Sequence, residues 1–310
     1  MPDALHNPSA ELAARSAAAR ALLRRVELVV ARQLDGLLQG ERRGRRPGPG
    51  SEPALTRPYE PGDDVRWVDW RLSARADDIQ VRVPEIEPVL TAWALVDASA
   101  SMGFGSNIRT KLDLGREVLV GLGLILARRS DRLGLVVTTG EGLPAVHPPR
   151  ADRRGLMRLL AQLDVDITAP TGSRTDLAGS INAIGQIARH RGLVAIISDF
   201  PNQPGLERAI GSLSRRHEVL AIEIRDRRER EIPELGAMRL RDVETGRTVL
   251  VDTSDPRFRE RFASAVAADS AARRGMLARA GARHLVLTAD EDWVLPLAGA
   301  LRNRDRKRAA

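Results

Sequence analysis

The chain has 310 residues, of which 43% are hydrophobic and 29% charged, so it can bury a large core and does not have the composition of a disordered protein. It contains no cysteine, which excludes disulfide bonds and thiolate metal sites, and its five histidines lack the spacing of a zinc site. The formal net charge of +8 comes from arginines spread through the whole chain, which favours a biased composition over a nucleic-acid-binding stripe.

The N-terminal residues, 1–40, predict one long amphipathic helix, because leucines and valines recur there at helical spacing after a capping Asn7-Pro8-Ser9 start. The next stretch, 41–56, is rich in arginine, glycine and proline and is expected to be a flexible linker. No signal sequence precedes the helix, and no apolar run is long enough to span a bilayer. We therefore expect a cytoplasmic protein without a transmembrane segment.

The segment 57–88 is dense in aromatic and charged residues. One interpretation is structural: its tryptophans pack on the sheet of the following domain, and arginine–carboxylate pairs fix the loop. The alternative is an interaction surface for a protein partner. Its candidate residues are Tyr59, Asp63, Asp64, Arg66, Trp67, Asp69, Trp70 and Arg75.

Short apolar runs alternate with helical stretches between residues 89 and 300. Strands are predicted at Val89–Val96, Leu133–Val137, Leu193–Ile197, Val219–Ile224 and His284–Leu287. Helices are predicted between them, at Lys111–Arg128, Arg153–Leu163, Thr175–Arg189, Gly205–Arg215 and Pro256–Ala280. This alternation is typical of a doubly wound α/β fold, in which helices cover both faces of a mostly parallel sheet. A hairpin turn is predicted at 243–248, and residues 301–310 are expected to form a frayed tail.

Oxygen-bearing side chains stand at three ends of these predicted elements. Asp97, Ser99 and Ser101 form an Asp-x-Ser-x-Ser sequence directly after the first strand, Asp199 follows the third strand, and Thr175 opens a helix. In a doubly wound sheet, ligands bind beyond the carboxyl ends of the strands, so we expect these side chains to gather there. Carboxylates and hydroxyls suit Mg²⁺, and the sequence predicts a magnesium site; the alternative is that these residues only cap helices.

The three loops, in this order, resemble the metal-ion-dependent adhesion site (MIDAS) of von Willebrand factor A domains. The resemblance implies that Asp97, Ser99, Ser101, Thr175 and Asp199 hold Mg²⁺, directly or through water. It also implies that an acidic side chain of a partner protein fills the open coordination position. Arg174 stands where that family usually has glycine, so Thr171 and Ser173 are alternatives to Thr175.

The string Y-x-P-G-D-D-x-R-x-x-D-W-x-x-S-A-R, which runs from Tyr59 to Arg75, resembles the bacterial family known as domain of unknown function 58. That family pairs a von Willebrand A-like domain with MoxR-type AAA+ ATPases and is associated with chaperone-like remodelling or maturation of client proteins. The resemblance implies an adaptor that binds protein. From the residues themselves, we expect neither an enzyme, because no histidine neighbours the serines, nor a specific nucleic-acid partner, because the arginines are spread through the chain. The alternative is a Mg²⁺-dependent phosphoester hydrolase using the same loops, although metal-assisted hydrolysis usually needs more carboxylates than these loops supply.

Overall fold

The computed structural model describes residues 17, 19–31, 55–76, 78–83, 90–106, 109–127, 131–139, 143–167, 175–241 and 248–308. The chain divides into two compact units. The main unit contains residues 1–35 and 90–310, and the smaller unit contains residues 36–89. The predicted linker, 41–56, lies outside the described residues apart from its last two, which begin a strand.

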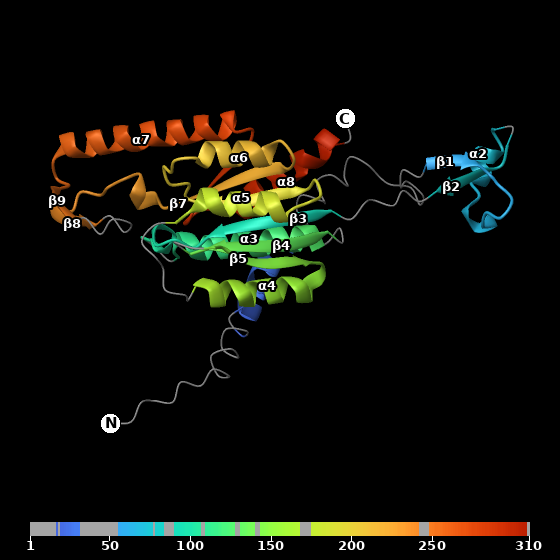
Figure 1. Ribbon diagram of the computed structural model, residues 1–310, viewed down its shortest axis with the longest axis horizontal. Coiled ribbons are helices and arrows are strands. Elements are labelled where there is room, and N and C mark those ends of the chain that lie inside the picture. Colours follow the sequence, from blue (N-terminus) through green and yellow to red (C-terminus); the bar gives the residue numbers. More distant parts are fainter. Residues whose placement is uncertain are drawn as a thin grey trace, which may run out of the picture. The chain divides into compact units, whose positions relative to one another are not determined.

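The main unit is built on a six-stranded sheet with the strand order β10-β7-β6-β3-β4-β5 (Figure 1). The strands are β3 (Thr91–Asp97), β4 (Arg132–Thr138), β5 (Ala145–Arg150), β6 (Leu193–Ser198), β7 (Glu218–Arg225) and β10 (Arg283–Thr288). All neighbours pair in parallel except β5, which lies antiparallel to β4 at one edge. The predicted doubly wound, mostly parallel α/β fold is confirmed.

Helices cover both faces of this sheet. One face carries α3 (Lys111–Ala127), α4 (Asp152–Ile167) and α8 (Val294–Arg308). The other face carries α5 (Leu177–Ile187), α6 (Leu206–Ser214) and α7 (Pro256–Arg279). The single-turn helices η2 (Ser101–Gly103) and η3 (Arg227–Glu229) follow β3 and β7, and β8 (Ala237–Arg241) pairs antiparallel with β9 (Thr248–Asp252). The turn predicted at 243–248 falls almost entirely outside the described residues.

The expectation of a frayed tail at 301–310 is wrong for most of that stretch, because α8 continues to Arg308. The charged residues at this end predict a solvated, irregular chain. The helix that forms instead accommodates Pro296, because this residue falls in the first turn, where proline is tolerated since its missing N–H has no intrahelical partner.

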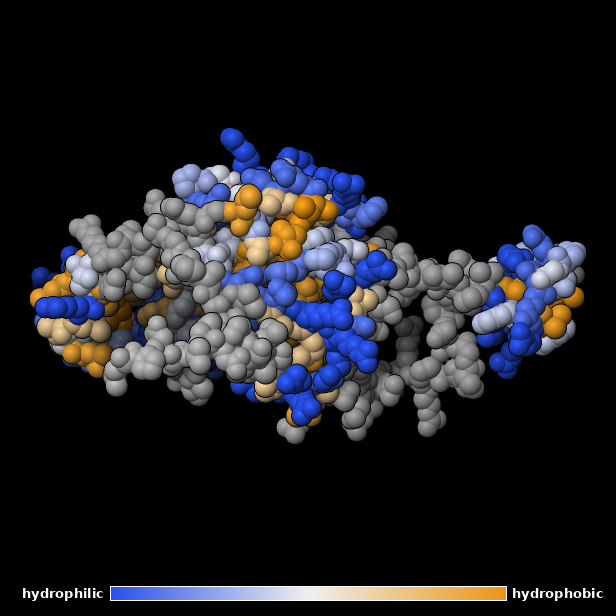
Figure 2. Space-filling model, turned by 60° about the horizontal axis from the view of Figure 1, so that its bottom comes forward, coloured by the Kyte–Doolittle hydropathy of each residue, from blue (hydrophilic) through white to orange (hydrophobic). Residues whose placement is uncertain are grey.

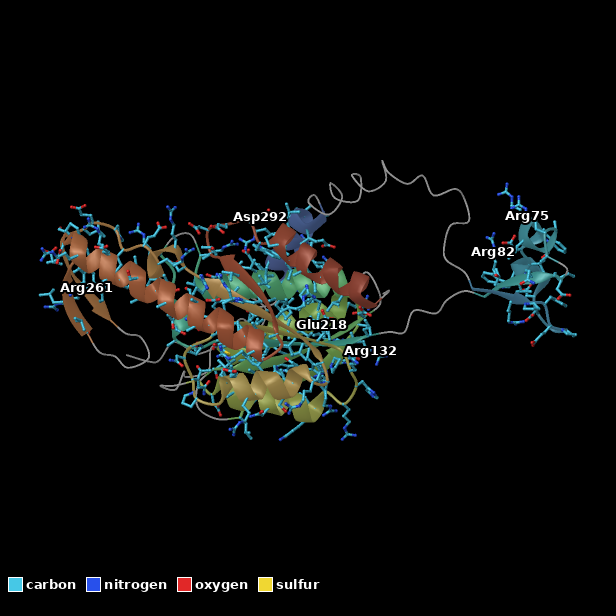
Figure 3. All side chains as sticks on the ribbon, turned by 90° about the horizontal axis from the view of Figure 1, so that it is seen from above. Arg75, Arg82, Arg132, Glu218, Arg261 and Asp292 are labelled. Atoms are coloured by element: carbon cyan, nitrogen blue, oxygen red, sulfur yellow. The ribbon has the colours of Figure 1, made fainter. Side chains whose placement is uncertain are left out.

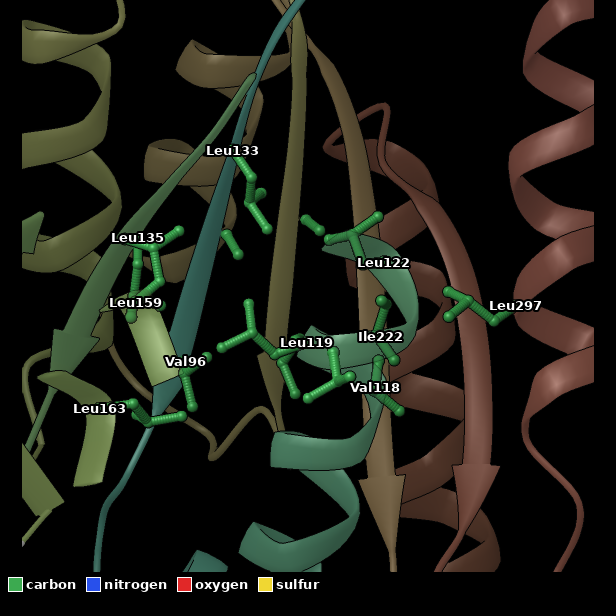
Figure 4. Close-up of a cluster of buried hydrophobic side chains, with 14 of the residues drawn as sticks. Val96, Val118, Leu119, Leu122, Leu133, Leu135, Leu159, Leu163, Ile222 and Leu297 are labelled. Atoms are coloured by element: carbon green, nitrogen blue, oxygen red, sulfur yellow. The ribbon is translucent and has the colours of Figure 1, made fainter. Parts of the chain in front are cut away.

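Side chains of β3 alternate between two hydrophobic cores. Ala92, Ala94 and Val96 face the core shared with α3, α4 and α8, part of which is drawn in Figure 4. Trp93 and Leu95 face the core shared with α5 and α6. Because both faces are covered, almost the whole strand is buried, and its sequence is a continuous apolar run.

Residues 19–31 form a helix, as predicted for the N-terminal segment. Its apolar face packs into the core that contains α3, with Ala19, Leu23, Val26 and Val30 all buried. An ion pair of 2.5 Å between Arg25 and Glu117 adds a polar contact with α3. The helix is therefore an integral part of the main unit. Across the described residues, no helix is both long and apolar enough to cross a membrane.

The smaller unit contains most of the segment 57–88. Its strands β1 (Leu55–Pro58) and β2 (Gln80–Val83) pair antiparallel, and η1 (Val65–Trp67) and α2 (Trp70–Ser73) lie between them in the chain. Val68 and Val81 are its buried hydrophobic residues in the described part of the chain. The expectation that this segment packs on the sheet stays a prediction.

Candidate metal centre

Two of the predicted ligand residues lie at the point where the strand order reverses. From β3 the chain continues to β4, which pairs with one side of β3, whereas β6 pairs with the other side of β3. Asp97 is the last residue of β3, and Asp199 directly follows the last residue of β6. Val96 pairs with Ile197, so Asp97 and Ser198 come next to each other at the carboxyl edge of the sheet. Open α/β sheets bind their ligands at such a position.

Asp97 is fully buried and organises the loop that follows it. Its Oδ2 atom accepts a hydrogen bond of 2.6 Å from the Ser198 hydroxyl, and its Oδ1 atom accepts one of 3.0 Å from the Ser99 backbone N–H. The hydroxyl oxygens of Ser99 and Ser101 are 3.1 Å apart. The structure thus brings the Asp-x-Ser-x-Ser side chains together as the sequence predicted.

Burial raises the pKa of Asp97 to about 6, and the nearby negative charge of Asp199 contributes to the rise. Hydrogen bonds from Ser198 and Ser99 lower it only in part. Two carboxylates in a dry site repel each other, and a cation placed between them would relieve that repulsion.

Asp199 is held from one side by a buried lysine. The Lys111 ammonium donates to Asp199 Oδ2 at 2.8 Å and to Glu229 Oε1 at 2.5 Å, and the Lys111 side chain is only 1% exposed. Burial alone would lower the pKa of Lys111, but the two carboxylates raise it above its usual value, so the ammonium stays charged.

The other oxygen of Asp199, Oδ1, is buried and has no hydrogen-bond partner among the described residues. A buried carboxylate oxygen without a donor is costly, and a metal ion beside it would satisfy it. Together with Asp97 and the hydroxyls of Ser99 and Ser101, it offers the all-oxygen donors that Mg²⁺ prefers. The residues present therefore fit a hard dication, with part of its shell left for water or a further ligand.

The loop after Ser101 is closed by a tight backbone contact. A Cβ atom at Gly105 would lie 2.6 Å from the Thr110 Cα atom, so only glycine fits there, whereas a Cβ atom at Gly103 would meet open space. Ser106 is tied to the loop after β7, since its backbone N–H and hydroxyl donate to Asp226 at 2.9 and 2.5 Å. The candidate metal loop, residues 98–106, is thereby held at both ends.

Thr175 is not joined to the other four predicted ligands by any described contact. It is half-buried and directly precedes Asp176, which caps α5 by accepting the Gly179 N–H at 2.7 Å. The helix-cap interpretation therefore holds for Asp176. The alternatives Thr171 and Ser173 lie outside the described residues, so the choice of threonine-loop ligand stays a prediction.

Three residues of this centre were missed in the sequence: Ser198, Lys111 and Glu229. Ser198 stands beside Asp199 and was passed over for the carboxylate. Lys111 looked like the exposed start of a helix, and its partners are 88 and 118 residues away in the chain. One signal was present, because only two of the 49 basic residues are lysines and one of them opens the helix after the metal loop.

Two histidines of the main unit pair with carboxylates away from the serines of the centre. His147 pairs with Asp166, and His284 pairs with Glu223, each at 2.7 Å. Burial by itself would raise the pKa of Glu223, but hydrogen bonds from His284 and Arg225 and the charge of Arg273 bring it down to about 2. This cluster has the character of a structural ion-pair network.

A cavity of about 420 Å³ opens beside Lys111 and Asp199. Its far wall is the inner face of α7, where Phe262 and Val266 are lining residues. The rings of Phe258 and Phe262 stack with centroids 6.4 Å apart. The candidate centre therefore borders a hollow with both charged and apolar walls, which is the composition of many ligand sites.

Three arginine–carboxylate pairs form within the smaller unit, as the structural interpretation predicted. Arg57 binds Asp63 through two hydrogen bonds of 2.6 and 2.7 Å, Arg66 binds Asp64, and Arg82 binds Asp69. Asp69 also caps α2.

The two tryptophans of this unit are not buried within it. Trp67 is 51% exposed and Trp70 is 67% exposed. Tyr59 is half-buried and Arg75 is exposed. Figure 2 shows hydrophobic and hydrophilic side chains next to each other on this unit. Exposed aromatics beside paired charges are what a protein-binding surface needs, so the interaction hypothesis for this segment stands.

Comparison with known proteins gives a family match and several relatives. The family model for "Protein of unknown function DUF58" matches residues 55–272. An uncharacterized protein of Mycobacterium tuberculosis (strain H37Rv) is 38% identical over 286 residues, which cover 92% of this chain and 90% of the relative. An uncharacterized protein of Mycobacterium avium is also 38% identical, over 51% of this chain and 94% of the relative.

Solved structures with a similar chain course have low sequence identity. An aerotolerance-related membrane protein from Bacteroides fragilis is 15% identical with a TM-score of 0.48, covering 70% of this chain and 99% of that one. The hypothetical protein BatB from Bacteroides thetaiotaomicron has a TM-score of 0.47 at 13% identity, covering 71% and 100%. The SpRpn10 VWA domain has a TM-score of 0.39 at 13% identity, covering 69% and 95%.

Proposed function

Since the chain belongs to the family of proteins of unknown function DUF58, we propose that it is a metal-ion-dependent protein-binding module and not an enzyme. The proposal also draws on the resemblance of its three loops to those of von Willebrand A domains. Asp97, Ser99, Ser101, Thr175 and Asp199 would hold Mg²⁺, directly or through water. The ion would bind an acidic side chain of a partner protein and thereby attach that partner to the carboxyl edge of the sheet.

One observation carries this proposal: the buried Asp97 and the half-buried Asp199 flank the strand-order reversal, and the buried Oδ1 atom of Asp199 has no hydrogen-bond partner in the described part of the chain. Helix caps alone would not require such an oxygen, since a cap accepts backbone N–H groups. A dication supplies the missing partner and offsets the repulsion between Asp97 and Asp199.

The finer part of the proposal concerns the partner. We propose an adaptor of a MoxR-type AAA+ ATPase that helps it remodel or mature client proteins in the cytoplasm. Its support is the family resemblance of the string from Tyr59 to Arg75 and of the metal loops. The cavity beside Asp199 offers room for the partner's chain next to the metal.

Calorimetric titration with Mg²⁺ tests the metal site. We expect the unaltered protein to bind the ion and Asp97→Ala to lose binding, since the substitution removes a carboxylate ligand. Asp255→Ala is the matched control: it also removes an aspartate, but Asp255 only caps α7 through the Arg257 N–H. Binding by Asp97→Ala equal to that of the control would rule out the proposed centre.

Capture of the MoxR-type ATPase then tests the partner. We expect capture by the unaltered protein and by Asp255→Ala in Mg²⁺, with loss in chelator and with Asp97→Ala. Hydrolysis of p-nitrophenyl phosphate is measured in the same preparations, because the rival hypothesis of a Mg²⁺-dependent phosphoester hydrolase requires turnover that depends on Asp97. Such turnover would replace the binding proposal.

A further inference from the structure

Lys111 is a cation built into the candidate metal centre. Its ammonium lies within hydrogen-bonding distance of Asp199 and Glu229 and has almost no contact with solvent. A charged ammonium is seldom buried unless carboxylates surround it, because its desolvation is expensive. The position therefore needs an explanation beyond the solvated start of a helix.

The choice of lysine at this position is unusual for the chain. Two of its 49 basic residues are lysines, and the rest are arginines. A guanidinium is planar, and its donors form a rigid fork, whereas an ammonium is a compact point charge with rotatable donors. At Lys111 the compact group fits between two carboxylates from different loops. A small, fixed positive charge is what distinguishes lysine here.

The surrounding contacts hold the ammonium in place. Glu229 ends η3, where its side chain also accepts the Asp226 backbone N–H at 3.2 Å. Asp226 in turn binds Ser106 of the metal loop. The cation is thus fixed between the loops after β3, β6 and β7. A metal ion entering the centre has to bind next to it.

We propose that Lys111 makes the centre depend on an acidic partner, because its fixed positive charge beside Asp199 weakens the binding of Mg²⁺ alone. This inference rests on the proposed function. Asp97 and Asp199 together match the charge of a dication, and Glu229 matches that of Lys111, but Lys111 binds Asp199 directly and thus competes with the metal for this carboxylate. A carboxylate from the partner would be attracted by both the ion and the ammonium. Lys111 occupies Asp199 Oδ2, so Oδ1 is the oxygen left to face the metal.

Calorimetric titration with Mg²⁺ alone tests the first part. Lys111→Met removes a unit positive charge from beside Asp199, so it is expected to bind Mg²⁺ at least about tenfold more tightly than the unaltered protein. Arg132→Met is the control, since it also removes one positive charge, but from the first residue of β4, at the amino-terminal end of the strands (Figure 3). The candidate centre lies at their carboxyl ends. The Mg²⁺ affinity of Arg132→Met is expected to stay unchanged.

Glu229→Gln is the second variant and has the opposite expected effect. It removes a negative charge and leaves the ammonium to Asp199 alone, so Mg²⁺ should bind several-fold more weakly. Because Lys111 keeps a charged partner, this variant stays informative if Lys111→Met does not fold. Tighter binding of Mg²⁺ to Glu229→Gln would overturn the inference.

Sodium acetate, compared with sodium chloride at equal ionic strength, supplies a probe carboxylate for the second part. We expect acetate to strengthen Mg²⁺ binding in the unaltered protein and to have less effect in Lys111→Met. An equal effect in both, or weaker Mg²⁺ binding by Lys111→Met, would overturn the role of Lys111. Failure of the proposed function has a different signature, in which neither the unaltered protein nor Lys111→Met binds Mg²⁺.

Discussion

The charge of Asp97 is expected to destabilise the metal-free protein. Its pKa is about 6 in the folded protein, above the ordinary value of 3.8, so the folded state holds the proton more tightly than the unfolded chain. Stability is then greatest at low pH and falls as the pH rises through 4 to 6. By linkage the penalty near neutral pH is about 3 kcal/mol. The binding of a dication would offset it.

Asp97→Asn is therefore expected to raise the melting temperature in chelator near neutral pH, with a gain that shrinks toward about pH 4. The amide keeps the size of the side chain and removes its charge. In Mg²⁺ the order reverses, because only the unaltered protein gains stability from the metal. Thermal unfolding across this pH range, with and without Mg²⁺, provides the measurement.

Asp113→Asn serves as the control, since the Asp113 side chain is 46% exposed on α3 and its described contacts are local, with Thr110 and Arg116. It should show neither the gain in chelator nor the loss in Mg²⁺. A lower melting temperature of Asp97→Asn in chelator would mean that the hydrogen bonds to Ser198 and Ser99 outweigh the buried charge.

The sequence located the predicted ligands that follow strands and missed the groups that reach the candidate centre from elsewhere. Asp97, Ser99, Ser101 and Asp199 could be predicted, because strand ends of a parallel sheet meet at one edge. Lys111 could not, since its role depends on contacts formed only when α3 packs beside β6 and η3. Long-range electrostatic partners of this kind have no local pattern.

At the scale of elements, the N-terminal helix is expected to stabilise the whole main unit. Leu23 is fully buried in the core that contains α3, so Leu23→Ala should lower the free energy of unfolding by about 2–5 kcal/mol through lost burial and the cavity left behind. Chemical denaturation of the main transition measures this loss.

Leu28→Ala is the matched control, because the same substitution is made in the same helix at a position that is 59% exposed. Its effect should stay within about 0.5 kcal/mol. If the two variants unfold at the same denaturant concentration, the helix does not contribute its buried face to the main unit in solution.

Elements with clear periodicity were predicted, and those at edges were not. The five parallel strands and the helices between them match to within a few residues. β5 was missed because Pro148 and Pro149 argue against a strand, but β5 lies at the edge of the sheet, where proline costs no interior ladder bond. β8 was missed because it is short: in its five residues, Met238 and Leu240 alternate with two arginines over a single repeat.

At the scale of the whole molecule, the two compact units offer separate candidate surfaces. The described side-chain hydrogen bonds and ion pairs of the smaller unit, such as Arg57 with Asp63 and Arg82 with Asp69, join partners within it. The metal centre is assembled from loops of the main unit. A substitution in one unit is therefore expected to leave the other intact, which allows the two surfaces to be tested independently.

Asp69→Ala is expected to reduce capture of the partner ATPase without changing Mg²⁺ affinity or the main unfolding transition. Asp69 accepts the backbone N–H groups of Arg71 and Leu72 and pairs with Arg82, so its loss should disorder the turn that carries Trp70. The loss of such a cap costs about 1 kcal/mol locally. Asp97→Ala, measured beside it, should lose both Mg²⁺ and capture. Unchanged capture by Asp69→Ala would limit the partner surface to the metal centre, and altered Mg²⁺ affinity would show that the two units are coupled.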